Sequence, residues 1–205
     1  GGNSDGQCDV PPLDAGTSYI QVSAGLKHTV LLRSDGSAVA CGRNSEGQCD
    51  IPPLDAGMSY TQVSAGGLHT VFLRSDGSAV ASGFNGNQQC TIPPLNDGMS
   101  YTQVSAGGLY TMLLQSDGRA VACGNNEHGQ CNIPPLDEAV SYTQISAGLN
   151  HTVLLRSDGC AVACGLNDGQ KCNIPQLEEG VSYTQVSAGC GHTVLLQSDG
   201  RAVAC

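Results

Sequence analysis

Apolar and polar residues alternate in short runs along the whole chain. Residues 19–24 (YIQVSA) place Ile, Val and Ala at every second position, and residues 28–34 (HTVLLRS) form another short run after a turn. A period of two is typical of strands with one buried face. Asp35-Gly36 then gives a two-residue hairpin signal, because such turns need positive φ. We expect strands over residues 19–24, 28–34 and 37–41.

A fourth and shorter run follows the hairpin. Residues 47–51 (GQCDI) lead directly into Pro52-Pro53. Proline cannot donate to a strand ladder and is confined to sheet edges. We therefore predict a brief fourth strand over residues 47–51 that forms the outer edge of its sheet.

The whole pattern recurs every 41 residues, and five copies account for the 205 residues. Short strands with a period near 40 residues are typical of propeller blades. The sequence predicts an all-β fold, a five-bladed β-propeller of four-stranded, 41-residue blades that forms a single domain over residues 1–205. The expected blades are residues 19–51, 60–92, 101–133, 142–174, and 183–205 together with 7–10.

The phase of the repeat leaves one blade divided between the two ends of the chain. Residues 7–10 correspond to the fourth strand, whereas residues 183–205 contain the first three strands of a copy. We expect residues 7–10 to pair beside residues 201–205 and to close the ring, since closure removes unpaired sheet edges.

Cysteines recur in pairs that are eight residues apart, and two interpretations remain open. If the third and fourth strands are neighbours, paired cysteines come within disulfide distance; alternatively, each cysteine is a small, reduced, buried residue. Ser82 stands opposite Cys90, so one copy lacks a pair. Oxidised pairs would indicate a secreted or luminal protein, and reduced ones a cytoplasmic or nuclear protein. The candidate pairs are Cys41–Cys49, Cys123–Cys131, Cys164–Cys172 and Cys8–Cys205.

Composition narrows the classes of partner. The chain has 18 acidic and 8 basic residues, a formal charge of −10, which disfavours nucleic acid because phosphate contacts need Lys and Arg. No apolar run approaches the roughly 18 residues of a membrane span. Neither nucleic acid nor a membrane is therefore expected as a partner, and the chain could form part of a larger assembly.

Residue types that could bind a metal or catalyse a reaction recur from copy to copy as part of the scaffold. Histidine occurs once per copy, at His28, His69, His151 and His192, but Tyr110 replaces it in the third copy. We interpret these histidines as structural, and the cysteine spacing is not that of a zinc site. No nucleophile has an unrepeated base beside it. We expect no metal, no cofactor and no catalysis.

The repeat itself resembles a known family. Residues 65–89 (AGGLHTVFLRSDGSAVASGFNGNQQ), with near copies in all five repeats, are similar to the repeat of the regulator of chromosome condensation family. With the following IPPL, the repeats are especially similar to the bacterial beta-lactamase inhibitor of that superfamily. The resemblance implies a β-propeller that acts through its faces on protein partners such as a small GTPase, chromatin, a lactamase or ubiquitin-ligase substrates.

The chain departs from that family in two respects. Relatives usually have seven blades, so five copies imply a smaller ring or a part of something larger. The family's tryptophan before the glycine of the third strand is absent, which removes the basis for the tryptophan-based light sensing of one plant relative. The residues in its place are Cys41, Ser82, Cys123, Cys164 and Cys205.

Two loops vary among the copies while the strands barely change: the turn between the first and second strands, and the loop after the third. They should emerge on one face, where loops on a rigid scaffold often supply recognition, although loops also vary when nothing constrains them. The candidate partner-binding residues are Lys27, Arg43, Glu46, Leu68, Phe84, Tyr110, His128, Asn150 and Leu166.

The opposite face should carry 12 of the 18 acidic residues, either as a solvated surface or as a docking site for a basic protein. The function that we expect is a non-catalytic protein-interaction or scaffold module. The alternatives are a structural subunit of a larger complex and a lectin-like carbohydrate-binding protein.

Overall fold

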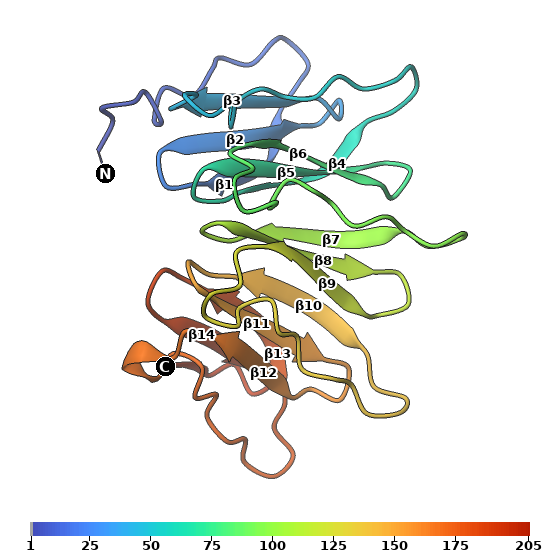
Figure 1. Cartoon of the computed structure of the whole chain (residues 1–205), viewed down its shortest axis with the longest axis vertical. Helices are drawn as coiled ribbons and strands as arrows, with labels where there is room; N and C mark the ends of the chain where they lie inside the picture. The colour runs from blue at the N-terminus through green and yellow to red at the C-terminus, as the bar shows by residue number, and fades with distance from the viewer. Residues whose placement is uncertain (1) are drawn as a thin grey trace.

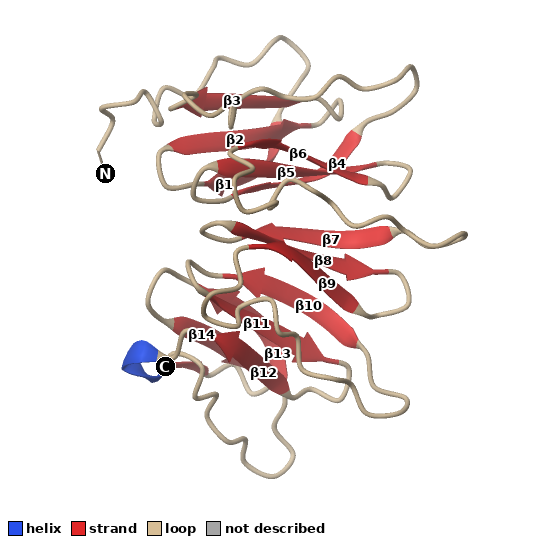
Figure 2. Ribbon diagram, in the orientation of Figure 1, coloured by secondary structure: helices blue, strands red, loops and turns tan. Residues whose placement is uncertain are grey.

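The computed structural model describes residues 2–205, and its regular elements are almost all strands, which form five separate three-stranded sheets connected by turns and loops (Figures 1 and 2). One 3₁₀ turn, η1 (Asp168–Gln170), is the single helical element of the described residues. The strands are β1 (Tyr19–Ala24), β2 (His28–Arg33), β3 (Ala38–Gly42), β4 (Tyr60–Ala65), β5 (His69–Arg74), β6 (Ala79–Gly83), β7 (Tyr101–Ala106), β8 (Tyr110–Gln115), β9 (Ala120–Gly124), β10 (Tyr142–Ala147), β11 (His151–Arg156), β12 (Ala161–Gly165), β13 (Tyr183–Ala188), β14 (Thr193–Gln197) and β15 (Ala202–Ala204).

Each sheet is an antiparallel meander in chain order. In the first sheet Val22 lies opposite Leu31, and Leu31 lies opposite Val39. The hairpin between β2 and β3 turns at Gly36, whose φ of 81° favours glycine. The predicted first strand is confirmed at residues 19–24, and the next two are confirmed to within one residue at each end.

The core lies between neighbouring sheets. Because side chains alternate across a strand, β2 points Val30 and Leu32 toward the second sheet. There they pack against Tyr60, Val63 and Phe72, all of which are buried. Equivalent clusters join the later sheets, so the molecule is a stack of five sheets in chain order, with β1–β3 at one end and β13–β15 at the other (Figure 1).

The predicted fourth strand is wrong. Residues 47–51 form consecutive turns, in which Gly47 N donates to Asn44 O and Asp50 N donates to Gly47 O. Gly47 has a φ of 82°, which a strand does not accommodate. The segment leaves its own sheet and crosses to the next one, where Gln48 O accepts a hydrogen bond from Thr70 Oγ1 at 2.7 Å. The blades are therefore three-stranded.

The predicted pairing of residues 7–10 beside residues 201–205 is also wrong. Gln7 O accepts from Thr29 Oγ1 at 2.8 Å, which places this segment on the first sheet. Strand β15 pairs only with β14. The reason is the forward crossing described above: the segment before each sheet packs on the sheet that follows it, so residues 7–10 belong to β1–β3.

Candidate partner-binding face

The two variable loops of each copy meet at the same end of their sheet. Arg43 N, in the loop after β3, donates to Lys27 O, in the turn before β2, at 2.8 Å. The same bond joins Phe84 N to Leu68 O. In the third and fourth sheets it runs from Asn125 N to Leu109 O and from Leu166 N to Asn150 O. We call the surface formed by these turns and loops the loop face.

Each loop after the third strand is held by one asparagine. Asn44 Oδ1 accepts from Cys49 N at 2.8 Å, and Asn44 Nδ2 donates to Asp50 Oδ1 at 2.7 Å. Gln48 is fully buried, and its Oε1 accepts from Glu46 N. The loop backbone is thus fixed by side chains of the repeat, while its remaining residues are free to differ.

The fourth copy holds its loop in another way. Lys171 stands where Gln48, Gln89 and Gln130 stand in the earlier copies, and it is equally buried. Its ammonium group donates to the Asp168 carboxylate within η1. In this copy an ion pair therefore replaces the buried glutamine amide that holds the loop in the other copies.

Eight of the nine sequence-predicted residues lie on the loop face within reach of solvent. Glu46 and His128 are exposed, and the other six are half-buried. Arg43 Nε donates to Ser45 Oγ at 2.8 Å, and Lys27 Nζ lies 3.7 Å from Asp5 Oδ2. The six half-buried residues are Lys27, Arg43, Leu68, Phe84, Asn150 and Leu166.

Tyr110 is not available to a partner. Its side chain is fully buried, and its hydroxyl donates to His151 O at 2.5 Å and accepts from Thr152 Oγ1 at 3.0 Å. Burial raises the pKa of this hydroxyl well above its usual value. Because Tyr110 takes the place of the repeated histidine, its larger ring extends to the next sheet instead of to solvent.

The repeated histidines join one sheet to the next. Nε2 of His28, His69 and His151 lies 2.8–3.0 Å from a threonine hydroxyl of the following sheet. Each hydroxyl donates to a backbone carbonyl, so Nε2 carries the proton that the hydroxyl accepts. Burial lowers the pKa of all three to about 4. These contacts give the three histidines a structural role, each through a threonine hydroxyl of the next sheet.

Of the two interpretations of the cysteine pairs, the disulfides are not supported: all eleven cysteines are free thiols. Cys49 Sγ points to Arg43 O within its own loop, whereas Cys41 Sγ points to Gln7 O on the preceding segment. The two thiols of a pair thus face different segments, because the chain segment that carries the second cysteine crosses toward the next sheet. Burial raises the pKa of Cys131 to about 11 and that of Cys123 to about 12.

A central pocket, which the sequence reasoning did not identify, opens where the five sheets meet. It has a volume of about 260 Å³ and is lined by the ends of the first strands and the turns that follow them. Glycine permits this convergence, since a Cβ at Gly66 would lie 2.5 Å from the Gly107 carbonyl oxygen. The recurring Ala-Gly pair at the end of each first strand was the available signal.

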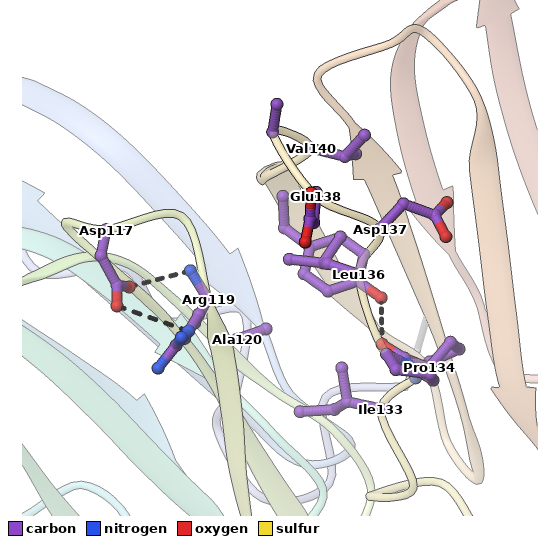
Figure 3. A pocket seen from close by; sticks show the side chains of 12 residues that line it. Asp117, Arg119, Ala120, Ile133, Pro134, Leu136, Asp137, Glu138 and Val140 are labelled. Carbon is purple, nitrogen blue, oxygen red and sulfur yellow. Dashed lines mark hydrogen bonds and ion pairs between the residues drawn. The ribbon is translucent and has the colours of Figure 1, made fainter.

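The opposite end of the sheets carries a groove of about 630 Å³ between the β8–β9 hairpin and the segment that leads to β10 (Figure 3). Ile133 and Leu136 form an apolar part of its lining. Asp117 and Arg119 stand on one wall, with 3.8 Å between Arg119 Nε and Asp117 Oδ2. Glu138 stands on the other wall. Of the acidic residues predicted for this end, Asp117, Asp137 and Glu138 line this groove.

Residues 2–205 contain no group of three or more metal-ligating side chains. In the same residues, no helix has the length and apolar character needed to cross a membrane.

Five sheets that converge on a central pocket, with loops gathered at one end, define the chain as a β-propeller-type repeat protein. The profile of the regulator of chromosome condensation (RCC1) repeat matches residues 19–48, 60–89, 101–130 and 142–170, more than half of the chain. The chain belongs to this family. No curated protein matches it.

Solved structures show the same fold at low sequence identity. Yeast RCC1 (Prp20), in its complex with Kap60, is 21% identical with a TM-score of 0.77, over 97% of this chain and 58% of that one. Human WBSCR16 is 18% identical with a TM-score of 0.79, over 94% and 62%. The ectodomain of the Physcomitrella patens receptor kinase CR4 is 17% identical with a TM-score of 0.70, over 94% and 52%. The chain thus spans less than two thirds of each of these proteins.

Proposed function

We propose that this protein is a non-catalytic protein-interaction scaffold that binds a partner protein through its loop face. The observation that carries the proposal is the backbone bond that brings two variable loops together in four successive sheets, as between Arg43 and Lys27. That bond pairs the two loops within each of four sheets, and bonds such as that from Gly67 N to Gly107 O link the turns of neighbouring sheets. We propose that the paired loops act together as one surface.

The loop face combines a fixed backbone with varied side chains. The asparagine and glutamine contacts hold the loops before a partner arrives, which limits the ordering entropy lost on association. Along the face, Arg43, Glu46, Phe84 and His128 supply positive, negative, aromatic and imidazole groups. A surface of this mixed character favours one specific protein partner over a repeated small ligand.

The relatives support a protein partner. Structures of yeast Prp20 concern its complex with Kap60 and its binding to Gsp1p and histones. The formal charge of −10 favours protein over nucleic acid for the present chain. We propose that residues 1–205 act as a single unit in this binding.

Site-specific photocrosslinking tests the proposal. A photoreactive amino acid placed at Arg43 or Phe84 should crosslink one and the same partner in the native source. The matched control is Glu179, an exposed residue on the opposite end of the sheets, which should give no crosslink to that partner. The double variant Arg43→Ala/Phe84→Ala should then weaken binding at least tenfold while circular dichroism stays unchanged. Crosslinking from position 179 alone, or full affinity of the double variant, would contradict the proposal.

A further inference from the structure

The groove beside the β8–β9 hairpin has fixed walls. Tyr142 N donates to Gly118 O at 2.7 Å, which ties the hairpin to the segment that leads to β10. The hydroxyl of Tyr142 donates to Pro134 O at 2.6 Å, which holds that segment in place. The groove lies between the third and fourth sheets, and each of these has a neighbour on both sides. Its shape therefore exists before a ligand binds, which limits the ordering entropy lost on binding.

One part of the lining is apolar (Figure 3). Ile133 and Leu136 are half-buried and pack against the apolar cluster between the third and fourth sheets. Pro135 and Val140 add further apolar atoms. The groove volume of about 630 Å³ lies within the range of small-molecule pockets. A groove of this size and lining suits a long side chain with an aliphatic stem.

The charged groups in the groove are mainly acidic. Three carboxylates line it, whereas Arg119 is the one cation among the described residues of the lining. Asp117 lies beside Arg119, and Asp137 accepts from Arg156 at 3.0 Å. Glu138, the third carboxylate, is exposed and forms no ion pair with another residue of the described chain. Glu138 is thus available to a cation from a ligand.

The surface around the groove is also acidic. The hairpins and the segments that precede the first strands, at this end of the sheets, contain 12 of the 18 acidic residues, against five arginines. Arg33, Arg156 and Arg201 already lie in ion pairs with carboxylates of these segments. The excess of negative charge attracts a basic partner from a distance and opposes an acidic one.

One turn of the groove wall carries strain that the other copies avoid. Ala139 has a φ of 63°, in the left-handed region that disfavours a side chain. Glycine holds the corresponding position in the other copies, at Gly16, Gly57, Gly98 and Gly180. Retained strain of this kind clusters at ligand-binding sites. The methyl group of Ala139 adds to the lining of the groove, which gives a physical reason for alanine at this position.

We propose that this groove binds a basic segment of a partner protein. One lysine or arginine of that segment inserts its side chain, with the aliphatic stem along Ile133 and Leu136 and beside Ala139. The cationic head group then pairs with the carboxylate of Glu138. This surface lies at the opposite end of the sheets from the loop face, so a ligand here does not compete with a partner bound there.

Selection from a random peptide library on the immobilised full chain tests the proposal. The probe is a phage library of peptides about twelve residues long. We expect the selected peptides to contain lysine and arginine about threefold more often than the starting library, because the groove and its surroundings are acidic. Affinity of the strongest peptide should fall about tenfold when sodium chloride rises from about 50 mM to about 500 mM.

Matched variants assign the peptide to the groove. Glu138→Gln should weaken binding of the strongest peptide about fivefold or more, whereas Glu179→Gln, the same change at the corresponding position of the next segment, should alter it less than about twofold. Arg119→Ser, which gives the residue found at Ser37 and Ser78, should strengthen binding about threefold, because it removes a competing cation.

Ala139→Gly separates binding from stability. It should weaken the peptide about threefold while it raises the stability of the fold, a combination that a purely structural role of Ala139 does not give. Selected peptides that lack basic residues, no selected peptide at all, or equal losses for Glu138→Gln and Glu179→Gln would each overturn the proposal. Peptides that lose affinity only in Arg43→Ala/Phe84→Ala would overturn it as well and would support the loop face instead, so the two proposals fail separately.

Discussion

Two segments of the chain, residues 151–155 and 192–196, share the sequence HTVLL but lie in different surroundings. In the interior sheet Val153 is fully buried and Leu155 is 7% exposed. In the terminal sheet the equivalent Val194 and Leu196 are 36% and 38% exposed. The local strand is the same in both places, so the difference arises from the neighbouring sheet, which β11 has and β14 lacks on that side.

The comparison shows where the stability of this protein resides. A three-stranded sheet has two faces, and only a sheet with a neighbour on each side buries both. The histidine that joins the sheets follows the same rule: His151 is fully buried against Thr193, whereas His192 is exposed. We expect the interior sheets to be more stable than the terminal ones, and the predictions below are arranged from the largest effect to the smallest.

Acidification should act on the interior junctions first. The folded-state pKa of His28, His69 and His151 is about 4, below the ordinary value of 6.5. The contribution of these neutral histidines to the stability of the folded state is therefore complete above about pH 6.5 and is lost as the pH falls toward 4. The loss is on the order of 3 kcal/mol for each histidine. Urea unfolding at a series of pH values measures it, and His69→Gln should remove the share of one histidine from the slope.

A large truncation inside a junction should have the next largest effect. Phe72 is fully buried and packs against Tyr60 with 4.9 Å between ring centroids. Phe72→Ala should lower the free energy of unfolding by about 3–5 kcal/mol, because it leaves a cavity. Denaturant titration measures the loss, and a change below 1 kcal/mol would mean that the first two sheets do not pack as described.

A matched pair sharpens the comparison of interior and terminal sheets. Leu155→Ala should cost about 2–4 kcal/mol, since the side chain is nearly buried between two sheets. Leu196→Ala, at the same position of the terminal sheet, should cost less than about 1 kcal/mol. Equal losses for the two variants would show that the terminal sheet is covered.

The smallest effect concerns a turn outside the junctions. Ala139 has a φ of 63°, while Gly57 and Gly98 take φ values of 84° and 76° in the corresponding turns. Ala139→Gly should raise stability by about 0.5–1 kcal/mol, because it relieves a left-handed alanine. Gly57→Ala is the reciprocal control and should lower stability by a similar amount.

Much of the sheet architecture was predictable from the sequence. Alternation and the Asp-Gly hairpin signal identified β1–β3 and their copies, because these are local properties of the chain. The fourth strand failed because Asn44 and Gly47 form a turn that periodicity does not reveal. The predicted pairing of residues 7–10 with residues 201–205 failed for a related reason: the direction in which residues 7–10 cross between sheets depends on the partner of Gln7, a contact made over 22 residues.

The candidate site was predictable in part. Two antiparallel strands lie between the two variable loops, so the sequence places both loops at the same end of the sheet. The bond between Arg43 and Lys27 agrees with this placement. The burial of Tyr110 was not predictable, because a change of residue type between copies does not show whether the new side chain is buried or exposed. The cysteine spacing suggested bonds, but whether Cys41 and Cys49 face each other depends on where the second segment goes.

Hydrogen exchange of the two HTVLL segments tests the account most directly, since their shared sequence makes the intrinsic exchange rates nearly equal. In the isolated chain at neutral pH, the amides of Thr193–Leu196 should exchange at least about a hundredfold faster than those of Thr152–Leu155, because the terminal sheet opens without a neighbour to hold it. Equal protection of the two segments would contradict an open stack of five sheets and show that the fifth sheet is covered.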